Sequence, residues 1–101
     1  MPSESEIQDL RRRLQEESLI ELLKRQDGSL SDGPNDRILE FGEDTKDKIN
    51  RRLIDDYREP IHLSDFTVGY IAALYEIVND ATVEEELDRD GFSGSPVQLE
   101  N

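Results

Sequence analysis

The chain has no cysteine, a single histidine and few aromatic residues, which make up 6% of its 101 residues. The lack of cysteine excludes disulfide bonds and thiolate metal sites. No run of residues approaches the roughly 20 apolar positions of a membrane-spanning helix. The opening MPSESEIQDL has neither the basic start nor the apolar run of a signal peptide. We therefore expect a soluble, cytoplasmic protein that does not associate with membranes.

Apolar residues are also scarce: 34% of the chain is hydrophobic, 37% is charged, and the net charge is −13. A chain of this length forms one domain at most, and this composition supplies only a modest core. Self-association would bury further apolar surface between subunits, so we expect a homo-oligomer. The acidity opposes direct binding to nucleic acid, because a phosphate backbone would be repelled.

The excess of acidic residues has three explanations: solubility or adaptation to a salty interior, a basic protein partner, or an acidic tail. The net charge is −3 in residues 27–42, −3 in 60–80 and −5 in 81–101, whereas 1–26 and 43–59 are nearly neutral. Salt adaptation tends to acidify the whole surface. The uneven distribution instead favours a local acidic surface that engages a basic protein.

Residues 3–26 contain no proline or glycine and begin with Ser3 and Glu6 at the spacing of a capping box. Their apolar residues form two stripes on different sides of a helical wheel. These stripes are Ile7, Leu10 and Leu14, followed by Leu19, Ile20, Leu22 and Leu23. Ser18 and Glu21 repeat the capping-box spacing, so the segment is either one helix or two. We favour one continuous helix whose two faces contact two different partners.

The stretch 27–37, DGSLSDGPNDR, is rich in the residues that form turns, which predicts a mobile loop. A short apolar patch follows at Ile38, Leu39 and Phe41 and ends at Gly42. No second strand is available to pair with this patch. We interpret it as part of a loop that covers the core.

A second helix is expected over 44–58, with Asp44 or Thr45 as its N-cap and Pro60 as its stop. The third, over 63–80 and capped by Ser64, is apolar around roughly 200° of the helical wheel, twice the stripe of a helix that packs on one side. We therefore expect it to be the central helix of a small bundle.

We predict an all-α fold with a single domain over residues 1–90. Its elements are three main helices at about 3–26, 44–58 and 63–80, a short fourth helix at 82–89 and a flexible acidic tail at 91–101. The fourth helix is indicated by Thr82 and Glu85, which have capping-box spacing.

No motif for catalysis is present. The lone His62 precedes a helix and is interpreted as a loop residue. There is no Ser-His-Asp order, HExxH pair or glycine-rich phosphate loop. Asp55 and Asp56 are adjacent, so on a helix they point about 100° apart and cannot act as a glycosidase pair. We expect neither an enzyme nor a bound cofactor.

The nearest approach to a metal site lies in EELDRDGFSG. With Glu86 at position 1, Asp88, Asp90 and Gly91 fall on positions 3, 5 and 6 of an EF-hand loop. Position 12 is Val97, where the loop requires a bidentate glutamate. We therefore expect no calcium or other metal.

Basic residues cluster on the first two expected helices. They are Arg11, Arg12 and Arg13, then Lys48, Arg51 and Arg52. Acidic residues stand three or four positions from most of them, which indicates weak ion pairs along helix faces. An alternative is a subunit contact in which these arginines meet the acidic half of a neighbour.

The segment 65–78, DFTVGYIAALYEIV, resembles a Gly-aromatic-Ile-x-Ala-Leu helix found in small proteins of tailed viruses. The resemblance covers about fourteen residues, is not specific to any family and implies no residue roles. It is consistent with a viral protein that acts in the host cytoplasm.

Two functions are compatible with these features. The first is a non-enzymatic acidic protein that binds a basic, nucleic-acid-handling protein, as viral inhibitors and DNA mimics do. The alternative is a structural or assembly subunit, of a virion or another oligomeric complex, that associates through apolar helix faces. The residues predicted to form the interface are Val68, Tyr75, Leu19, Leu23, Glu84, Glu85 and Asp88.

Overall fold

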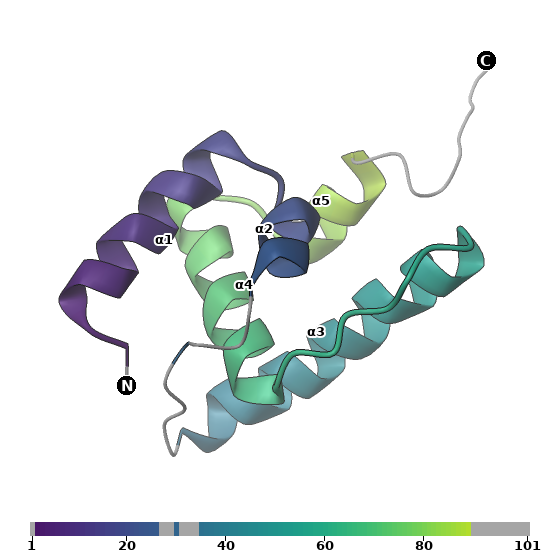
Figure 1. Ribbon diagram of the computed structural model, residues 1–101, viewed down its shortest axis with the longest axis horizontal. Helices are drawn as coiled ribbons and strands as arrows, with labels where there is room; N and C mark the ends of the chain where they lie inside the picture. Colours follow the sequence, from purple (N-terminus) through teal and green to yellow (C-terminus); the bar gives the residue numbers. More distant parts are fainter. Residues whose placement is uncertain (1, 27–29, 31–34, 90–101) are drawn as a thin grey trace.

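The computed structural model describes residues 2–26, 30 and 35–89, and every regular element in them is a helix (Figure 1). The helices are α1 (Glu4–Glu16), α2 (Leu19–Arg25), α3 (Asp36–Asp55), α4 (Asp65–Asn79) and α5 (Val83–Arg89). The predicted all-α fold is confirmed. The tail predicted at 91–101, and the part of the predicted loop at 27–29 and 31–34, lie outside the described residues.

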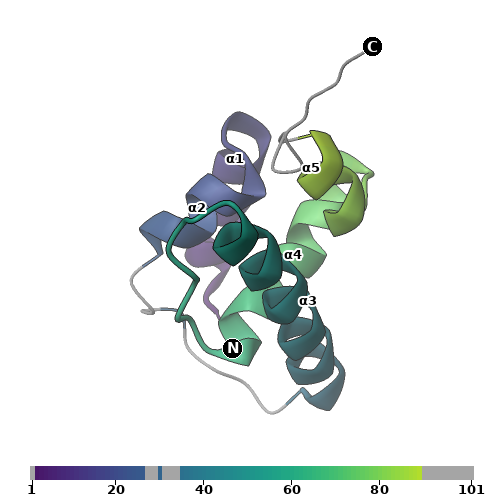
Figure 2. The ribbon, with the colours of Figure 1, turned by 90° about the vertical axis from the view of Figure 1, so that its right-hand side faces the viewer.

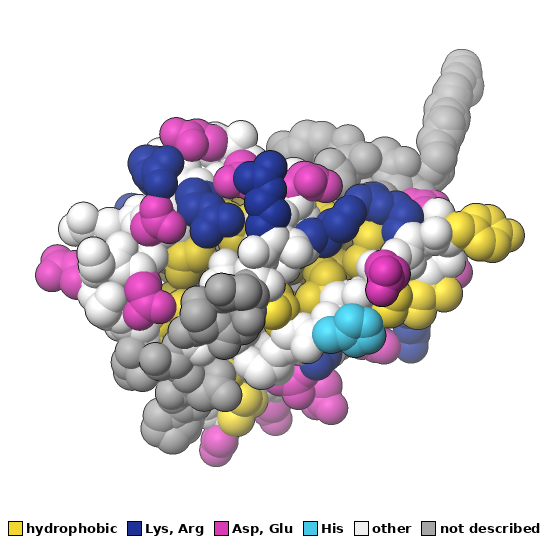
Figure 3. Space-filling model, in the orientation of Figure 1, with side chains coloured by type: hydrophobic (Ala, Val, Ile, Leu, Met, Phe, Trp, Pro, Cys, Tyr) yellow, Lys and Arg dark blue, Asp and Glu magenta, His cyan; other side chains and the backbone are white. Residues whose placement is uncertain are grey.

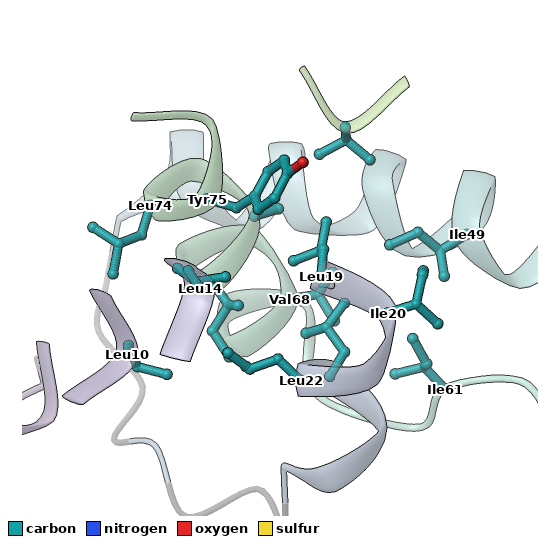
Figure 4. Close-up of a cluster of buried hydrophobic side chains, with 14 of the residues drawn as sticks. Leu10, Leu14, Leu19, Ile20, Leu22, Ile49, Ile61, Val68, Leu74 and Tyr75 are labelled. Carbon is teal, nitrogen blue, oxygen red and sulfur yellow. The ribbon is translucent and has the colours of Figure 1, made fainter. Parts of the chain in front are cut away.

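The centre of the fold is α4, which contacts each of the other four helices. Figure 1 shows α4 between α1 and α3, and Figure 2 shows α1 and α2 together at the left, away from α5. Eight of the fifteen residues of α4 are buried, which explains the unusual width of its apolar face. Figure 4 shows how its side chains Val68 and Tyr75 lie among leucines and isoleucines from α1, α2 and α3.

The first helical segment is broken, so the prediction of one continuous helix was wrong. Glu17 is extended, with φ −124° and ψ 159°, and Ser18 caps α2 by accepting a hydrogen bond from the Glu21 N–H at 3.2 Å. The break has a packing cause. A straight helix would hold its two apolar stripes on different sides, whereas the turn at Ser18 directs both stripes into one core.

Helix α3 begins at Asp36, eight residues before the start that the sequence predicted. The N-cap is Asn35, whose Oδ1 accepts a hydrogen bond from the Ile38 N–H at 3.1 Å, and not Asp44 or Thr45. The patch interpreted as a covering loop therefore forms the first turns of a helix.

Gly42 does not end a helix but lets α3 approach α4 closely. A Cβ atom at Gly42 would overlap the Asp65 carbonyl and lie 2.8 Å from the Gly69 nitrogen. A Cβ atom at Gly69 would overlap the Ile38 carbonyl and lie 2.9 Å from the Gly42 nitrogen. The two helices therefore cross backbone against backbone at this pair of glycines.

The remaining capping predictions are confirmed. Ser3 and Glu6 form a complete capping box at the start of α1. Ser64 caps α4 by accepting from the Thr67 N–H at 3.2 Å. Thr82 and Glu85 exchange hydrogen bonds of 2.8 and 3.1 Å at the start of α5, the short fourth helix of the prediction.

Candidate functional site

A depression lies between α3 and the start of α4, and we call it the acidic trough. Its volume is about 600 Å³. Five carboxylates, one ammonium and one amide line it: Glu40, Glu43, Asp44, Asp47, Asp65, Lys46 and Asn50. The trough is thus a concave surface with a strong excess of negative charge.

The trough owes its acidity to the spacing of carboxylates along α3. Glu40, Glu43, Asp44 and Asp47 follow Asp36 at intervals that place all five on one face of the helix. From Asp36 to Asp47 this face runs for about 16 Å along the helix axis. Figure 3 shows acidic side chains along the lower edge of the molecule, over the N-terminal half of α3.

Nearby cations offset this charge only in part. Lys46 lies 2.8 Å from Asp65, while Lys48 and Arg51 pair with Asp44 and Asp47 at 3.3 and 3.2 Å. Ion pairs on an exposed helix face contribute at most a few tenths of a kcal/mol each, so a partner can displace them. The carboxylates of Glu40 and Glu43 form no ion pair with another described residue.

The four apolar residues predicted to form an interface are buried within the chain itself. The exposed fractions of Val68, Tyr75, Leu19 and Leu23 are 0%, 2%, 0% and 1%. α2 turns back onto α4 and covers the edge that the sequence left open. These four side chains are therefore not available to a second subunit in this fold, and a charge at Tyr75 would disrupt the core of the protomer.

The three acidic residues of that predicted interface lie on α5. Glu84 and Asp88 are exposed, and their carboxylates approach Lys48 and Arg52 of α3 at 3.9 Å. Glu85 caps its own helix through Thr82. The sequence suggested that basic residues of one subunit meet the acidic half of a neighbour. In the structure, basic residues of α3 instead lie close to acidic residues of α5 in the same chain.

Two of the basic residues of α1, Arg12 and Arg13, form ion pairs along the helix face, as the sequence indicated. Arg12 lies 2.6 Å from Asp9, and this hydrogen bond and the nearby negative charge raise the pKa of Arg12. Arg13 lies 3.5 Å from Glu17. These contacts pair Arg12 and Arg13 with carboxylates of α1 and of its C-cap.

No group of three or more His, Asp or Glu residues in the described part of the chain is arranged to hold a metal ion. Glu86, the first position of the EF-hand comparison, is only 5% exposed. Its carboxylate accepts hydrogen bonds from the Tyr75 hydroxyl at 2.7 Å and the Leu19 N–H at 3.2 Å. Asp90, Gly91 and Val97 lie outside the described residues, and His62 is exposed between α3 and α4.

Comparison with known proteins adds no assignment: no family model, curated protein or solved structure matches the chain. Among the described residues, no helix is long and apolar enough to cross a bilayer. The site is therefore interpreted from its own geometry and charge.

The acidic trough was missed in the sequence because α3 was expected to start at residue 44. With that start, Asp36 and Glu40 fell in a loop or patch and had no fixed relation to Asp47. The signal was present, since carboxylates at i, i+4, i+7, i+8 and i+11 share one helix face.

Strain at the end of α3 gives the first testable prediction. Tyr57 has a φ of 58°, in the left-handed region that favours glycine, and its side chain is 99% exposed. We expect Tyr57→Gly to raise the free energy of unfolding by about 1 kcal/mol, because relief of strain outweighs the added freedom of the unfolded chain. Urea denaturation followed by circular dichroism measures this change. Tyr57→Ala, which keeps a Cβ atom, is the matched control and should give no comparable gain.

Proposed function

We propose that this chain is a non-enzymatic binding protein that engages a basic protein partner at the acidic trough. The observation that carries the proposal is the trough itself, a concave surface lined by five carboxylates and a single ammonium group. A cationic side chain entering this depression would meet several carboxylates at once. Complementary charge of this kind increases association rates and discriminates against acidic competitors.

A protein that handles nucleic acid is the partner class that best suits the acidic face of α3. Five carboxylates over about 16 Å correspond to one charge per about 4 Å of axis. A single strand of DNA carries one phosphate per about 3.4 Å. A basic groove built for a phosphate strand would therefore accept this face, although Lys48 and Arg51 reduce its effective charge. The resulting activity is inhibition or modulation of that partner by occupation of its nucleic-acid site.

Neutralisation of the trough tests this function. We expect Glu40→Gln/Glu43→Gln/Asp47→Asn to weaken binding of an arginine-rich peptide at least about tenfold, since each exposed charge contributes a few tenths of a kcal/mol or more. Isothermal titration calorimetry gives the affinity. Nuclear magnetic resonance titration should place the shifts on residues 36–47 and at Asp65.

The matched control removes three carboxylates elsewhere, by Glu4→Gln/Glu16→Gln/Asp80→Asn, and leaves the same net charge as the trough variant. We expect it to weaken binding of the peptide by no more than about twofold. Its affinity for the peptide should still fall as added salt shortens the Debye length from about 14 to 4 Å. If the two variants lose equal affinity, or if the wild-type shifts spread over the whole surface, the trough is not the binding site.

A second candidate function is that of an assembly subunit. The observation that favours it is a set of large apolar side chains on the surface of the described chain, which are Leu39, Ile54, Tyr57 and Ile77. Three of these are more than half exposed, in a chain with few apolar residues to spare. The contact between subunits would then use residues other than the buried ones that the sequence indicated.

A further inference from the structure

Two apolar features near opposite ends of α3 have no partner among the described residues. The first, which we call the knob, is formed by Ile54 and Tyr57, whose exposed fractions are 58% and 99%. The second, which we call the groove, has a volume of about 200 Å³. The residues that line the groove are Ile38, Tyr70, Ala73, Leu74 and Ile77.

The side chains of the knob are not used by the protomer itself. The left-handed backbone of Tyr57 belongs to the cap of α3, in which the Tyr57 and Arg58 N–H groups donate to the Ile54 and Leu53 carbonyls at 3.0 and 2.7 Å. The ring of Tyr57, however, is 99% exposed and packs against no described residue. Tyrosine is enriched at the centres of contacts between proteins. Figure 3 shows hydrophobic side chains projecting at the right-hand end of the molecule, over the end of α3.

No charged residue lines the groove, in contrast to the acidic trough. An apolar lining selects an apolar occupant, since a polar group would lose its hydration without gaining a partner. An apolar cavity of about 150 Å³ is large enough to hold a benzene ring. The groove can therefore accept the ring of a tyrosine.

Charged residues of both signs stand beside the two features. Asp55, Asp56 and Glu59 flank the knob, and none of them forms an ion pair with another described residue. Arg37, next to Ile38 at the groove, is exposed and likewise has no such ion pair. A knob seated in a groove would bring carboxylates toward this arginine.

A knob cannot reach the groove of its own chain. Ile38 and Ile54 are sixteen residues apart on the same helix, α3, and are therefore separated by about 24 Å along its axis. Figure 1 shows α3 as a single straight element between these two positions. Any contact between knob and groove must therefore join two molecules.

We propose that the knob of one copy inserts into the groove of a second copy, which joins the chains head to tail. Such a contact closes into a two-fold dimer where each knob fills the groove of the other copy, and otherwise continues into a ring or a filament. Each copy carries a net charge of −13, and this repulsion keeps the association weak at low salt. Salt should strengthen it, which is the opposite of its effect on binding at the acidic trough. The trough takes no part in this contact, so either proposal can fail without the other.

Sedimentation velocity on the full chain tests the proposal, at up to about 1 mM protein and about 0.5 M NaCl, where charge is screened beyond about 4 Å. We expect the wild-type mass to rise with concentration to that of a dimer or a larger species. The knob variant Tyr57→Gly and the groove variant Ala73→Gln/Ile77→Gln should each weaken association at least about tenfold. Circular dichroism establishes that both variants fold, and Ile77→Gln alone replaces the double variant if it does not.

Mixing the two variants gives the decisive result. The knob variant keeps an intact groove and the groove variant keeps an intact knob, so an equimolar mixture should form a one-to-one dimer and no larger species. A wild-type chain that remains monomeric at the highest concentration would overturn the proposal. So would a mixture that stays monomeric while the wild type associates, or an association that neither variant weakens.

Discussion

Gly42→Ala should lower the free energy of unfolding by about 3 kcal/mol or more, out of the roughly 5–15 kcal/mol of a domain of this size. The added Cβ atom would overlap the Asp65 carbonyl, which belongs to the backbone of α4 and cannot rotate away. The two helices must then separate along a contact that supports Ile49 and Leu53 in the core. The corresponding fall in melting temperature is about 12 °C or more.

Whether Gly42→Ala raises or lowers the free energy of unfolding shows which effect is larger, the packing of α3 against α4 or the local helix propensity. Alanine is favoured over glycine in a helix by about 1 kcal/mol, so propensity alone predicts that Gly42→Ala stabilises α3. Glu43→Ala, at the next and exposed position, is the matched control and should change stability by less than about 0.5 kcal/mol. Urea denaturation of both variants measures the difference. A Gly42→Ala protein as stable as the wild type would mean that α3 and α4 do not touch at the glycines.

The same glycine explains much of what the sequence could and could not predict about α3. Gly42 was interpreted as the end of an apolar patch because glycine weakens an isolated helix. Its actual role depends on the backbone of α4, which lies 27 residues further along the chain at Gly69 and is not visible in any local pattern. The caps at Ser3, Ser64 and Thr82 were predictable because a cap is formed within four residues.

The burial of the apolar residues predicted to form an interface could not be deduced from the sequence, for a related reason. The apolar face of α4 was correctly recognised as too wide for one neighbour, which left its edge, including Val68 and Tyr75, open to a second subunit. Whether that edge is exposed depends on the direction of α2 after Ser18. A continuous first helix would have carried Leu19 and Leu23 away from it, whereas the observed turn places both in the core.

The positions of the carboxylates in the fold also change how the acidity of the chain is understood. The sequence placed the excess of acidic residues in 27–42, 60–80 and 81–101, yet the described carboxylates of the last segment are partly engaged with α3 and with their own helix. On α3, by contrast, the carboxylates gather around a depression and two of them have no ion-pair partner among the described residues. Charge counted along a chain therefore predicts that an acidic surface exists but not where it lies.

Glu86 provides the second large effect, because its buried carboxylate joins three helices. It lies on α5 and accepts hydrogen bonds from the Tyr75 hydroxyl of α4 and from the Leu19 N–H at the start of α2. Glu86→Ala would remove the acceptor of two buried donors, each of which costs about 1–3 kcal/mol when left without one. We expect a loss of about 2–4 kcal/mol in the free energy of unfolding, measured by urea denaturation.

Two comparisons show whether that loss comes from the hydrogen bonds. Glu84→Ala removes an exposed carboxylate from the same helix and should change stability by less than about 0.5 kcal/mol. Tyr75→Phe removes only the hydroxyl donor, so combining it with Glu86→Ala should give less than the sum of the two losses, by about 1 kcal/mol. Hydrogen exchange should also quicken at the Leu19 amide in Glu86→Ala, because that N–H loses its acceptor. If Glu86→Ala matched Glu84→Ala in stability and in exchange, α5 would not depend on this carboxylate for its place against α2 and α4.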